Sequence, residues 1–199
     1  SMNSLENGRR TIVWFRGKDL RVNDHQGLKL ASDLGGDVLP LFIIDPYFFA
    51  PERVKEMPHR IQFLLESLEE LEGSVRELGS QLLVLSGSCH SVLDRLIKEY
   101  GATDLVAQRW SDPLGRKRDQ RIESLAAVRC HWVEGETLGK PGTLRTKAGQ
   151  PFSVFTPFAR SFRQNIHIGE PLPPPKLPPF SYRGVSDSIP KLTDLGVTP

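Results

Sequence analysis

Five short apolar runs, separated by segments with helical periodicity, limit what this chain can fold into. The runs are rich in β-branched and aromatic residues and occupy residues 11–15, 38–44, 82–85, 104–107 and 128–133. Strands that alternate with helices favour βαβ units, in which right-handed crossovers bring parallel strands into one sheet. The sequence therefore predicts an α/β fold, a Rossmann-like three-layer sandwich with a five-stranded parallel sheet and helices on both faces.

A long amphipathic helix is expected between the second and the third of these strands. Its apolar residues recur at steps of three and four and share one face: Ile61, Leu64, Leu68, Leu71, Val75 and Leu78. Pro58 suits the first turn of this helix, and Gly79 suits its end. Shorter helices fit residues 24–34, 89–100 and 113–127, and each would close a right-handed crossover.

Composition divides the chain into three parts. Residues 1–9 lack the basic start and apolar centre of a secretory signal, and a Ser before the first Met is typical of a cloning remnant, so we expect a tag or a disordered start. Residues 10–165 are expected to form the α/β domain. Six of the nine residues from 171 to 179 are Pro, which favours an extended, semi-rigid segment rather than a packed element. We therefore interpret residues 166–199 as a Pro-rich linker towards a further domain.

Charge is nearly balanced, with 26 Lys and Arg against 24 Asp and Glu, and this balance alone does not indicate a nucleic-acid partner. Residues 137–169 contain no acid. The basic residues of this stretch are Lys140, Arg145, Lys147, Arg160 and Arg163. Contact with DNA phosphates is one use of such a cluster, but we expect it to dock against a further domain.

Two cysteines, Cys89 and Cys130, fit neither a CxxC metal pattern nor a disulfide framework, and no apolar run reaches the roughly 18 residues of a membrane span. We interpret both as packing residues in a reduced environment. We therefore expect a soluble, intracellular protein without a membrane partner, in the cytoplasm or, in a eukaryote, in the nucleus or an organelle. A targeting peptide that had been removed would leave no trace here.

Ligands of open parallel α/β sheets bind at the carboxyl ends of the strands, near the point where the strand order reverses. The loops expected at these ends, together with the start of the long helix, combine cations, carboxylates and aromatic rings. Such a mixture suits a planar heteroaromatic ligand with polar edges. The candidate cofactor-binding residues are Arg16, Lys18, Asp45, Arg60, Arg109, Trp110 and Asp112.

Several polar residues in these loops also have a structural interpretation. Asp112, which precedes Pro113, would form a helix N-cap. Asp24 would cap the first helix or form an ion pair with Arg21, and Ser88 would cap the helix after the third strand. A solvated helix face is the interpretation for one basic group: Arg116, Lys117, Arg118 and Arg121.

Motifs of several enzyme classes are absent from the sequence. It contains no GxGxxG, GxxxxGK[ST], GxSxG or HExxH, which argues against a dinucleotide fingerprint, a P-loop, an α/β-hydrolase and a zinc protease. The histidines at 25, 59, 90, 131 and 167 show no spacing typical of metal ligands. We therefore expect neither a catalytic residue nor a metal site in this chain.

Four segments, in order along the chain, resemble the DNA photolyase and cryptochrome family. Residues 12–25, IVWFRGKDLRVNDH, are similar to its opening V-W-F-R-x-D-L-R-x-x-D-N, with Gly-Lys in place of one residue. Residues 60–68, RIQFLLESL, resemble its second helix, and residues 112–119, DPLGRKRD, resemble its E-P-x-x-R-x-R-D, with Asp in place of Glu. Residues 142–158, GTLRTKAGQPFSVFTPF, are similar to its G-x-x-x-T-x-x-G-x-P-x-x-V-F-T-P-F.

This resemblance implies an antenna domain. Family members carry a light-harvesting pigment in an N-terminal α/β domain, followed by a long linker and a helical domain that binds FAD and the DNA lesion. The resemblance covers the first half of this plan, so FAD and damaged DNA are expected only with the helical domain, which is the expected partner. We expect a light-harvesting domain of a deoxyribodipyrimidine photo-lyase-like enzyme, which repairs DNA with blue light and is not catalytic without its helical domain. The alternatives are the antenna domain of a cryptochrome photoreceptor and a stand-alone nucleotide-binding module.

The resemblance also implies roles for single residues. Asp112 occupies the carboxylate position that hydrogen-bonds the pterin ring in folate-binding relatives. Arg60 matches an arginine that borders the deazaflavin pocket in other relatives. Trp110 stands where deazaflavin binders have a carboxylate. The resemblance therefore favours methenyltetrahydrofolate over deazaflavin as the antenna pigment, and an empty pocket is the remaining alternative.

Overall fold

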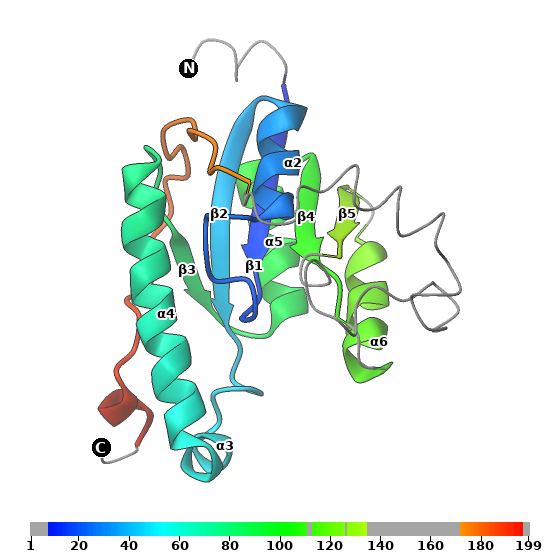
Figure 1. Cartoon of the computed structure of the whole chain (residues 1–199). Helices are drawn as coiled ribbons and strands as arrows, with labels where there is room; N and C mark the ends of the chain where they lie inside the picture. The colour runs from blue at the N-terminus through cyan, green and yellow to red at the C-terminus, as the bar shows by residue number, and fades with distance from the viewer. Residues whose placement is uncertain (1–7, 111–112, 126, 135–171, 197–199) are drawn as a thin grey trace, which may run out of the picture.

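A parallel sheet forms the centre of the protein in a computed structural model, which describes residues 8–110, 113–125, 127–134 and 172–196. The strands are β1 (Arg10–Phe15), β2 (Asp37–Ile44), β3 (Leu83–Ser86), β4 (Asp104–Gln108) and β5 (Arg129–Val133). They pair in the order β3-β2-β1-β4-β5, all parallel, so the order reverses between β1 and β4 (Figure 1). The predicted five-stranded parallel sheet is confirmed, with bounds close to those expected.

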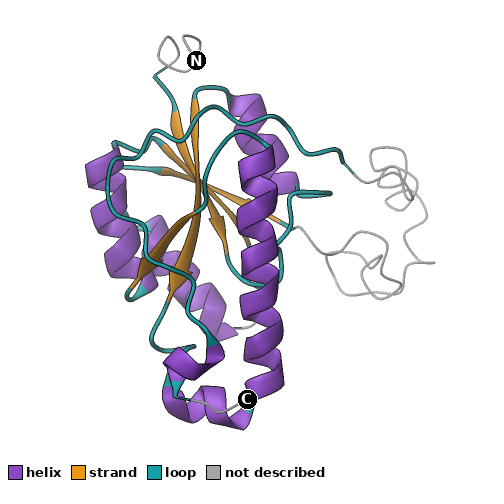
Figure 2. Ribbon diagram, turned by 90° about the vertical axis from the view of Figure 1, so that its left-hand side faces the viewer, coloured by secondary structure: helices purple, strands orange, loops and turns teal. Residues whose placement is uncertain are grey.

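Helices cover both faces of this sheet. On one face lie α2 (Gln26–Leu34) and α4 (Pro58–Glu77), and on the other lie α5 (Cys89–Tyr100) and α6 (Pro113–Glu123) (Figure 2). Alternate residues of β1 face opposite sides of the sheet: Val13 lies in the core on the side of α2 and α4, and Ile12 lies in the core on the side of α5 and α6. This alternation follows from the two-residue period of a strand. The predicted three-layer sandwich is therefore confirmed.

A short helix, α3 (Pro51–Glu56), precedes α4 and lies outside the predicted elements. Both helices begin with Pro in the first turn, where the missing amide leaves no hydrogen bond unmade. Met57 between them has a φ of −137° and a ψ of 57°, outside the helical region, so it separates the two helices. In contrast, α6 ends before its predicted limit, because the amide of Leu125 donates to the carbonyl of Ile122 in a closing turn.

Residues 172–196, which we call the strap, run back along the α/β domain (Figure 2). At the edge of β3, the amide of Val84 donates to Ser186 Oγ (3.0 Å), and the amide of Asp187 donates to the carbonyl of Val84 (2.7 Å). The amide of Ser86 donates to Asp187 Oδ2 (2.9 Å). The strap thereby covers backbone groups that an edge strand would otherwise expose.

Apolar side chains anchor the strap to the domain. Leu177 and Leu192 are buried in the core on the side of α2 and α4, and the amide of Leu177 donates to the carbonyl of Leu78 (2.9 Å). Most of the strap has no regular secondary structure, and one turn of 3-10 helix, η3 (Leu192–Leu195), lies near its end. The expectation that this segment does not pack is wrong, because leucines among the prolines supply apolar anchors. The expected boundary between residues 165 and 166 lies outside the described residues.

Arg9 departs from the disordered start expected for residues 1–9. Its carbonyl accepts the amide of Asp37 (2.9 Å), and its Nη1 lies 3.2 Å from Asp104 Oδ2. The contacts with the sheet therefore already include Arg9, while residues 1–7 lie outside the described residues. Among the ranges that the structure describes, no helix has the length and apolar character needed to cross a membrane.

Candidate functional site

A cavity of about 360 Å³ lies at the carboxyl edge of the sheet, where the strand order reverses. Residues that end or follow β1, β2 and β4 line it, together with the helices that start there. Its aromatic lining consists of Trp14, Phe42, Tyr47, Phe48, Phe49 and Trp110, and its polar lining consists of Arg16, Asp45, Arg53, Cys89 and Arg118. The cavity therefore occupies the position expected from strand order, and its size suits a ligand of a few fused rings.

An ion pair between Arg16 and Asp119 forms the inner part of the wall. Arg16 Nη1 lies 2.8 Å from Asp119 Oδ1, and both side chains are less than a tenth exposed. The guanidinium carbon lies 4.1 Å from the ring centroid of Trp14 and 5.0 Å from that of Trp110, within reach of cation–π attraction. Burial lowers the pKa of Arg16 and raises the pKa of Asp119, and the attraction between the two charges offsets only part of each shift. The pair therefore fixes two tryptophan rings around one buried cation.

Asp19 fixes the loop that follows Arg16. Its Oδ1 accepts the backbone amides of Arg16 (2.9 Å) and Gly17 (3.3 Å), and its Oδ2 lies 2.9 Å from His25 Nε2. His25 Nδ1 accepts the amide of Leu28 (2.9 Å), so the remaining ring proton is at Nε2 and faces the carboxylate. Desolvation would raise the pKa of Asp19, but the hydrogen bonds from His25 and the two amides outweigh it and lower that pKa.

The roles expected for Asp24 and Arg21 are corrected by the structure. His25, not Asp24, is the N-cap of α2, and Arg21 Nη2 donates to the backbone carbonyl of Asp24 (3.1 Å) rather than to its carboxylate. Asp24 has a φ of +50°, and its amide donates to the carbonyl of Leu172 in the strap (2.8 Å). The part of the opening motif that follows Arg16 therefore builds the loop beneath the cavity, whereas Trp14 and Arg16 of the same motif line the cavity.

Asp45 connects the end of β2 to the start of α5. Its Oδ1 accepts the amide of Tyr47 (2.9 Å), and its Oδ2 accepts the amide of Cys89 (3.1 Å). Burial, together with the neighbouring Asp45 carboxylate, raises the pKa of the Cys89 thiol to about 12. The thiol is therefore protonated at neutral pH and unreactive. Ser88 occupies the N-cap position of α5, as predicted, but its side chain makes no capping hydrogen bond.

Two arginines flank the Tyr47 ring at the outer part of the cavity. Their guanidinium carbons lie 4.0 Å (Arg53) and 4.2 Å (Arg118) from the ring centroid. Within the described ranges, neither arginine has a carboxylate at ion-pair distance. A recess of about 250 Å³ adjoins this group and is lined also by Arg121 and the first turn of α5. The outer cavity therefore presents cationic charge that the described residues do not neutralise.

The structure brings some of the candidate residues together and leaves others apart. Arg16, Asp45 and Trp110 line the cavity. Lys18 is exposed, Arg60 is exposed beside Met57 Sδ (3.4 Å), and Arg109 Nε lies 3.5 Å from Glu134 Oε1; none of these three lines the cavity. Asp112 lies outside the described residues. A ligand-binding role for each of the candidates stays a prediction.

Sequence reasoning missed Tyr47, Arg53 and Arg118. The aromatic run Tyr47-Phe48-Phe49 directly after a strand was a usable signal, because rings at a carboxyl edge commonly line a pocket. For Arg118 the expected solvated face is wrong: it is only partly exposed and lies over the Tyr47 ring. The cause is Gly115, where a Cβ atom would lie 2.7 Å from Trp110 Cβ, so α6 approaches the tryptophan closely.

The described wall is suited to holding a ligand rather than to transforming one. Its carboxylates are engaged by amides or by a guanidinium, and its thiol is protonated. What remains for a ligand is a set of aromatic faces and two cations. Such a wall matches a planar ring system with an anionic arm.

Comparisons with known proteins agree with this fold. The DNA photolyase family model matches residues 11–178. A deoxyribodipyrimidine photo-lyase of Agrobacterium fabrum is 33% identical over 168 residues, which are 83% of this chain and 34% of the relative. A cryptochrome DASH of Gloeobacter violaceus is 36% identical over 196 residues, which are 94% of this chain and 38% of the relative. The chain thus spans little more than a third of the length of these relatives.

Solved structures show the same architecture. A class III photolyase of Agrobacterium tumefaciens matches with a TM-score of 0.61 and 31% identity, over 96% of this chain and 39% of that one. An archaeal photolyase of Sulfolobus tokodaii matches with a TM-score of 0.69 and 24% identity, over 95% of this chain and 42% of that one. The family model covers more than half of the chain, and the solved structures share its α/β fold. The chain therefore belongs to the DNA photolyase family, which includes photolyases and cryptochromes, and corresponds to its N-terminal α/β domain.

Proposed function

We propose that the carboxyl-edge cavity binds a light-absorbing pigment and that this domain passes the excitation energy to a flavin held by a helical domain. The family is one that binds flavin and antenna pigments. The observation that carries the proposal is the aromatic cavity whose outer cations, Arg53 and Arg118, have no carboxylate partner in the described ranges. Rigid walls matter for such a role, because energy transfer depends on the distance and orientation that the protein imposes.

The pigment proposed first is methenyltetrahydrofolate. It combines a planar ring system with carboxylate groups, which match the aromatic wall and the two outer arginines. Asp112 would hydrogen-bond the pterin ring, as the resemblance to folate-binding relatives implies. Deazaflavin is the second candidate, since Trp110 replaces the carboxylate that its binders carry. The Sulfolobus tokodaii photolyase is described as holding two FAD molecules, with the implication of a novel light-harvesting cofactor, so a flavin is the third.

Other residues act through the shape of the cavity. Arg16 would hold Trp14 and Trp110 in place through its pair with Asp119, and Asp45 would fix the start of α5. Lys18, Arg60 and Arg109 lie outside the wall. Lys18 and Arg109 stay proposals from their loops at the carboxyl edge, and Arg60 stays a proposal from the resemblance. No role is proposed for Cys89 beyond its contact with the cavity.

The function of a complete protein is a separate proposal. A chain carrying this domain and a helical FAD domain would repair damaged DNA with blue light, and this domain alone would not be catalytic. A photoreceptor role is the alternative, since a cryptochrome DASH is among the relatives. The partner proposed for this domain is its own helical domain, and damaged DNA would be contacted only through the full-length protein.

Reconstitution with pigment tests the proposal. The purified chain is mixed in turn with methenyltetrahydrofolate, deazaflavin and FAD, and pigment that remains bound after gel filtration is measured by its near-UV and blue absorption. We expect a band at a one-to-one ratio for one pigment, and Arg118→Gln should weaken its binding about tenfold, the effect of losing one charge-assisted hydrogen bond. Binding should also quench tryptophan fluorescence, because Trp14 and Trp110 line the cavity.

A matched control is available on the same helix. Arg116 is exposed on α6 and does not line the cavity, so Arg116→Gln removes the same charge and should leave pigment binding unchanged. Equal losses in the two variants would show that net charge, not the cavity, attracts the pigment. No band with any of the three pigments, in a chain that unfolds cooperatively, would contradict the proposal.

A further inference from the structure

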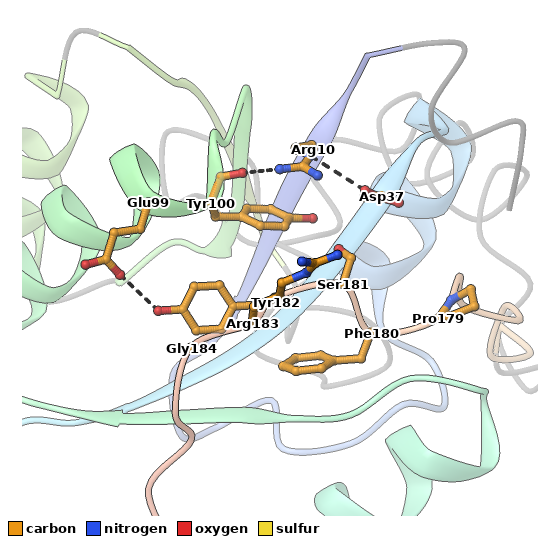
Figure 3. A pocket seen from close by; sticks show the side chains of 10 residues that line it. All are labelled: Arg10, Asp37, Glu99, Tyr100, Pro179, Phe180, Ser181, Tyr182, Arg183 and Gly184. Atoms are coloured by element: carbon orange, nitrogen blue, oxygen red, sulfur yellow. Dashed lines mark hydrogen bonds and ion pairs between the residues drawn. The ribbon is translucent and has the colours of Figure 1, made fainter.

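A second cavity, of about 640 Å³, lies at the opposite, amino edge of the sheet (Figure 3). Arg10 at the start of β1, Asp37 at the start of β2 and Tyr100 at the end of α5 form its floor. Residues 179–184 of the strap form its other side. This cavity therefore exists only where the strap lies against the domain.

Its floor carries a buried hydroxyl group beside Ser181 of the strap. Tyr100 is 3% exposed, and among the described residues its hydroxyl has no partner with full hydrogen-bond geometry. Burial raises the pKa of this hydroxyl to about 12, and the side chain of Ser181, which lies near it, offsets part of that shift. Arg10 lies over the Tyr100 ring (5.0 Å), donates to the Tyr100 carbonyl, and has its Nε 3.6 Å from Asp37 Oδ2. Figure 3 shows the hydroxyl directed towards the space between Arg10 and Ser181. A buried hydroxyl whose hydrogen bond is poorly formed is costly, so a ligand that supplies a better partner would bind with an advantage.

The strap supplies aromatic rings and one further cation. The Tyr182 hydroxyl donates to Glu99 Oε2 (3.0 Å), and the rings of Phe180 and Tyr182 meet edge to face at 6.5 Å. A Cβ atom at Gly184 would lie within 2.4 Å of the Tyr182 ring, so glycine lets the chain turn close to it. Arg183 is exposed and has no carboxylate at ion-pair distance within the described part of the chain.

The charges around the cavity leave one cation available. Asp37 faces Arg10, and Glu99 accepts from Tyr182 and lies 3.9 Å from Arg95. Both carboxylates are thus engaged, which leaves Arg183 for an anion. A ligand that uses this lining needs an aromatic ring and an anionic group.

We propose that this amino-edge cavity binds a nucleoside monophosphate. The base would pack against Phe180 and Tyr182, the phosphate would contact Arg183, and the Tyr100 hydroxyl would donate to the ligand. Because strap and floor would contact the same molecule, binding would hold the strap on the domain. This site is independent of the pigment cavity, which lies at the other edge of the sheet.

Titration calorimetry of the whole chain with AMP tests the proposal, with adenosine and inorganic phosphate as separate probes. AMP should bind at least about tenfold more tightly than either fragment, because it uses both the rings and the cation. Arg183→Gln should remove this advantage over adenosine. Arg129, which is exposed at the start of β5 and does not line the cavity, provides the matched control, and Arg129→Gln should bind AMP like the wild type.

A second variant tests the floor. Tyr100→Phe removes only the hydroxyl, so it should weaken AMP binding without lowering the melting temperature, whereas a purely structural hydroxyl would change stability and not affinity. Arg118→Gln at the other edge should leave AMP binding unchanged. If this variant bound AMP more weakly, the nucleotide would be binding in the pigment cavity, and the proposal would be overturned. Equal affinity for AMP and adenosine, or no binding at millimolar AMP, would also overturn it.

Discussion

The two edges of the sheet each carry a cavity, but the two cavities are held together in different ways. At the carboxyl edge, the wall comes from strand ends and helices that are fixed by the buried Arg16–Asp119 pair and the amide contacts of Asp45. At the amino edge, half of the wall is the strap, which meets the domain through a few hydrogen bonds and two buried leucines. The walls of the first cavity therefore belong to the sheet and its helices, while the second cavity needs the strap in place, and we expect the strap to detach without unfolding the sheet.

The largest expected effect is at the carboxyl edge. Asp119→Asn leaves the Arg16 guanidinium buried without its counter-charge, and we expect the free energy of unfolding in urea to fall by about 3 to 5 kcal/mol. The same change in an exposed pair is the control, since Asp33 lies 2.7 Å from Lys29 on the surface of α2 and Asp33→Asn should change little. A loss of similar size in both variants would contradict the idea that this pair fixes the wall.

A smaller effect is expected from the strap. Leu177→Ala removes a buried anchor, which costs about 2 to 3 kcal/mol where the surroundings do not collapse. Because this contact holds the strap on the domain, trypsin should cut after Arg183 at least about tenfold faster, and we expect urea unfolding of the domain to change less. Val185→Ala, at a side chain that is 83% exposed, is the control. If the resistance to trypsin and the stability in urea fall by the same free energy, the strap and the sheet unfold as one unit, and the contrast between the two edges disappears.

The smallest expected effect concerns pH and the loop beneath the pigment cavity. The pKa of Asp19 is lowered in the folded protein, so its ionised form stabilises the fold above the ordinary carboxyl pKa of about 3.9. This contribution is lost as pH falls through the lowered pKa. Asp19→Asn should therefore be less stable than the wild type by about 1 kcal/mol at pH 7, and the gap should shrink towards pH 3. A gap that is constant with pH would show that the charge of Asp19 contributes nothing.

The architecture was predictable because it rests on repeating patterns. Strands of alternating or continuous apolar residues and the spacing of leucines in α4 fix the number, order and direction of elements. Asp45 and Trp110 could be placed at the correct edge because each follows a strand, and the carboxyl ends of parallel strands lie at the same edge of the sheet. Local features were harder to predict. The helix α3 is too short and too charged to show periodicity, and the proline-rich composition of the strap gave no indication that two of its leucines would be buried.

Contacts between distant residues were not predictable from one sequence. The partner of Arg16 is Asp119, and which of the α6 arginines faces the cavity depends on how closely Gly115 approaches Trp110. Likewise, the Asp19–His25 pair follows from the course of the loop, although both residues belong to the most recognisable motif. Pattern therefore locates the site, whereas tertiary packing decides which side chains reach it.

The contacts between the strap and β3 also set an order of events during synthesis. Val84 and Ser86 receive their strap partners from Ser186 and Asp187, about a hundred residues later in the chain. Contacts of such long sequence separation form late, because a long loop must close before they yield any stabilisation. On the ribosome, the sheet can assemble while the outer edge of β3 is still bare, so the nascent domain passes through a stage in which that edge is open to chaperones or to misplaced strands.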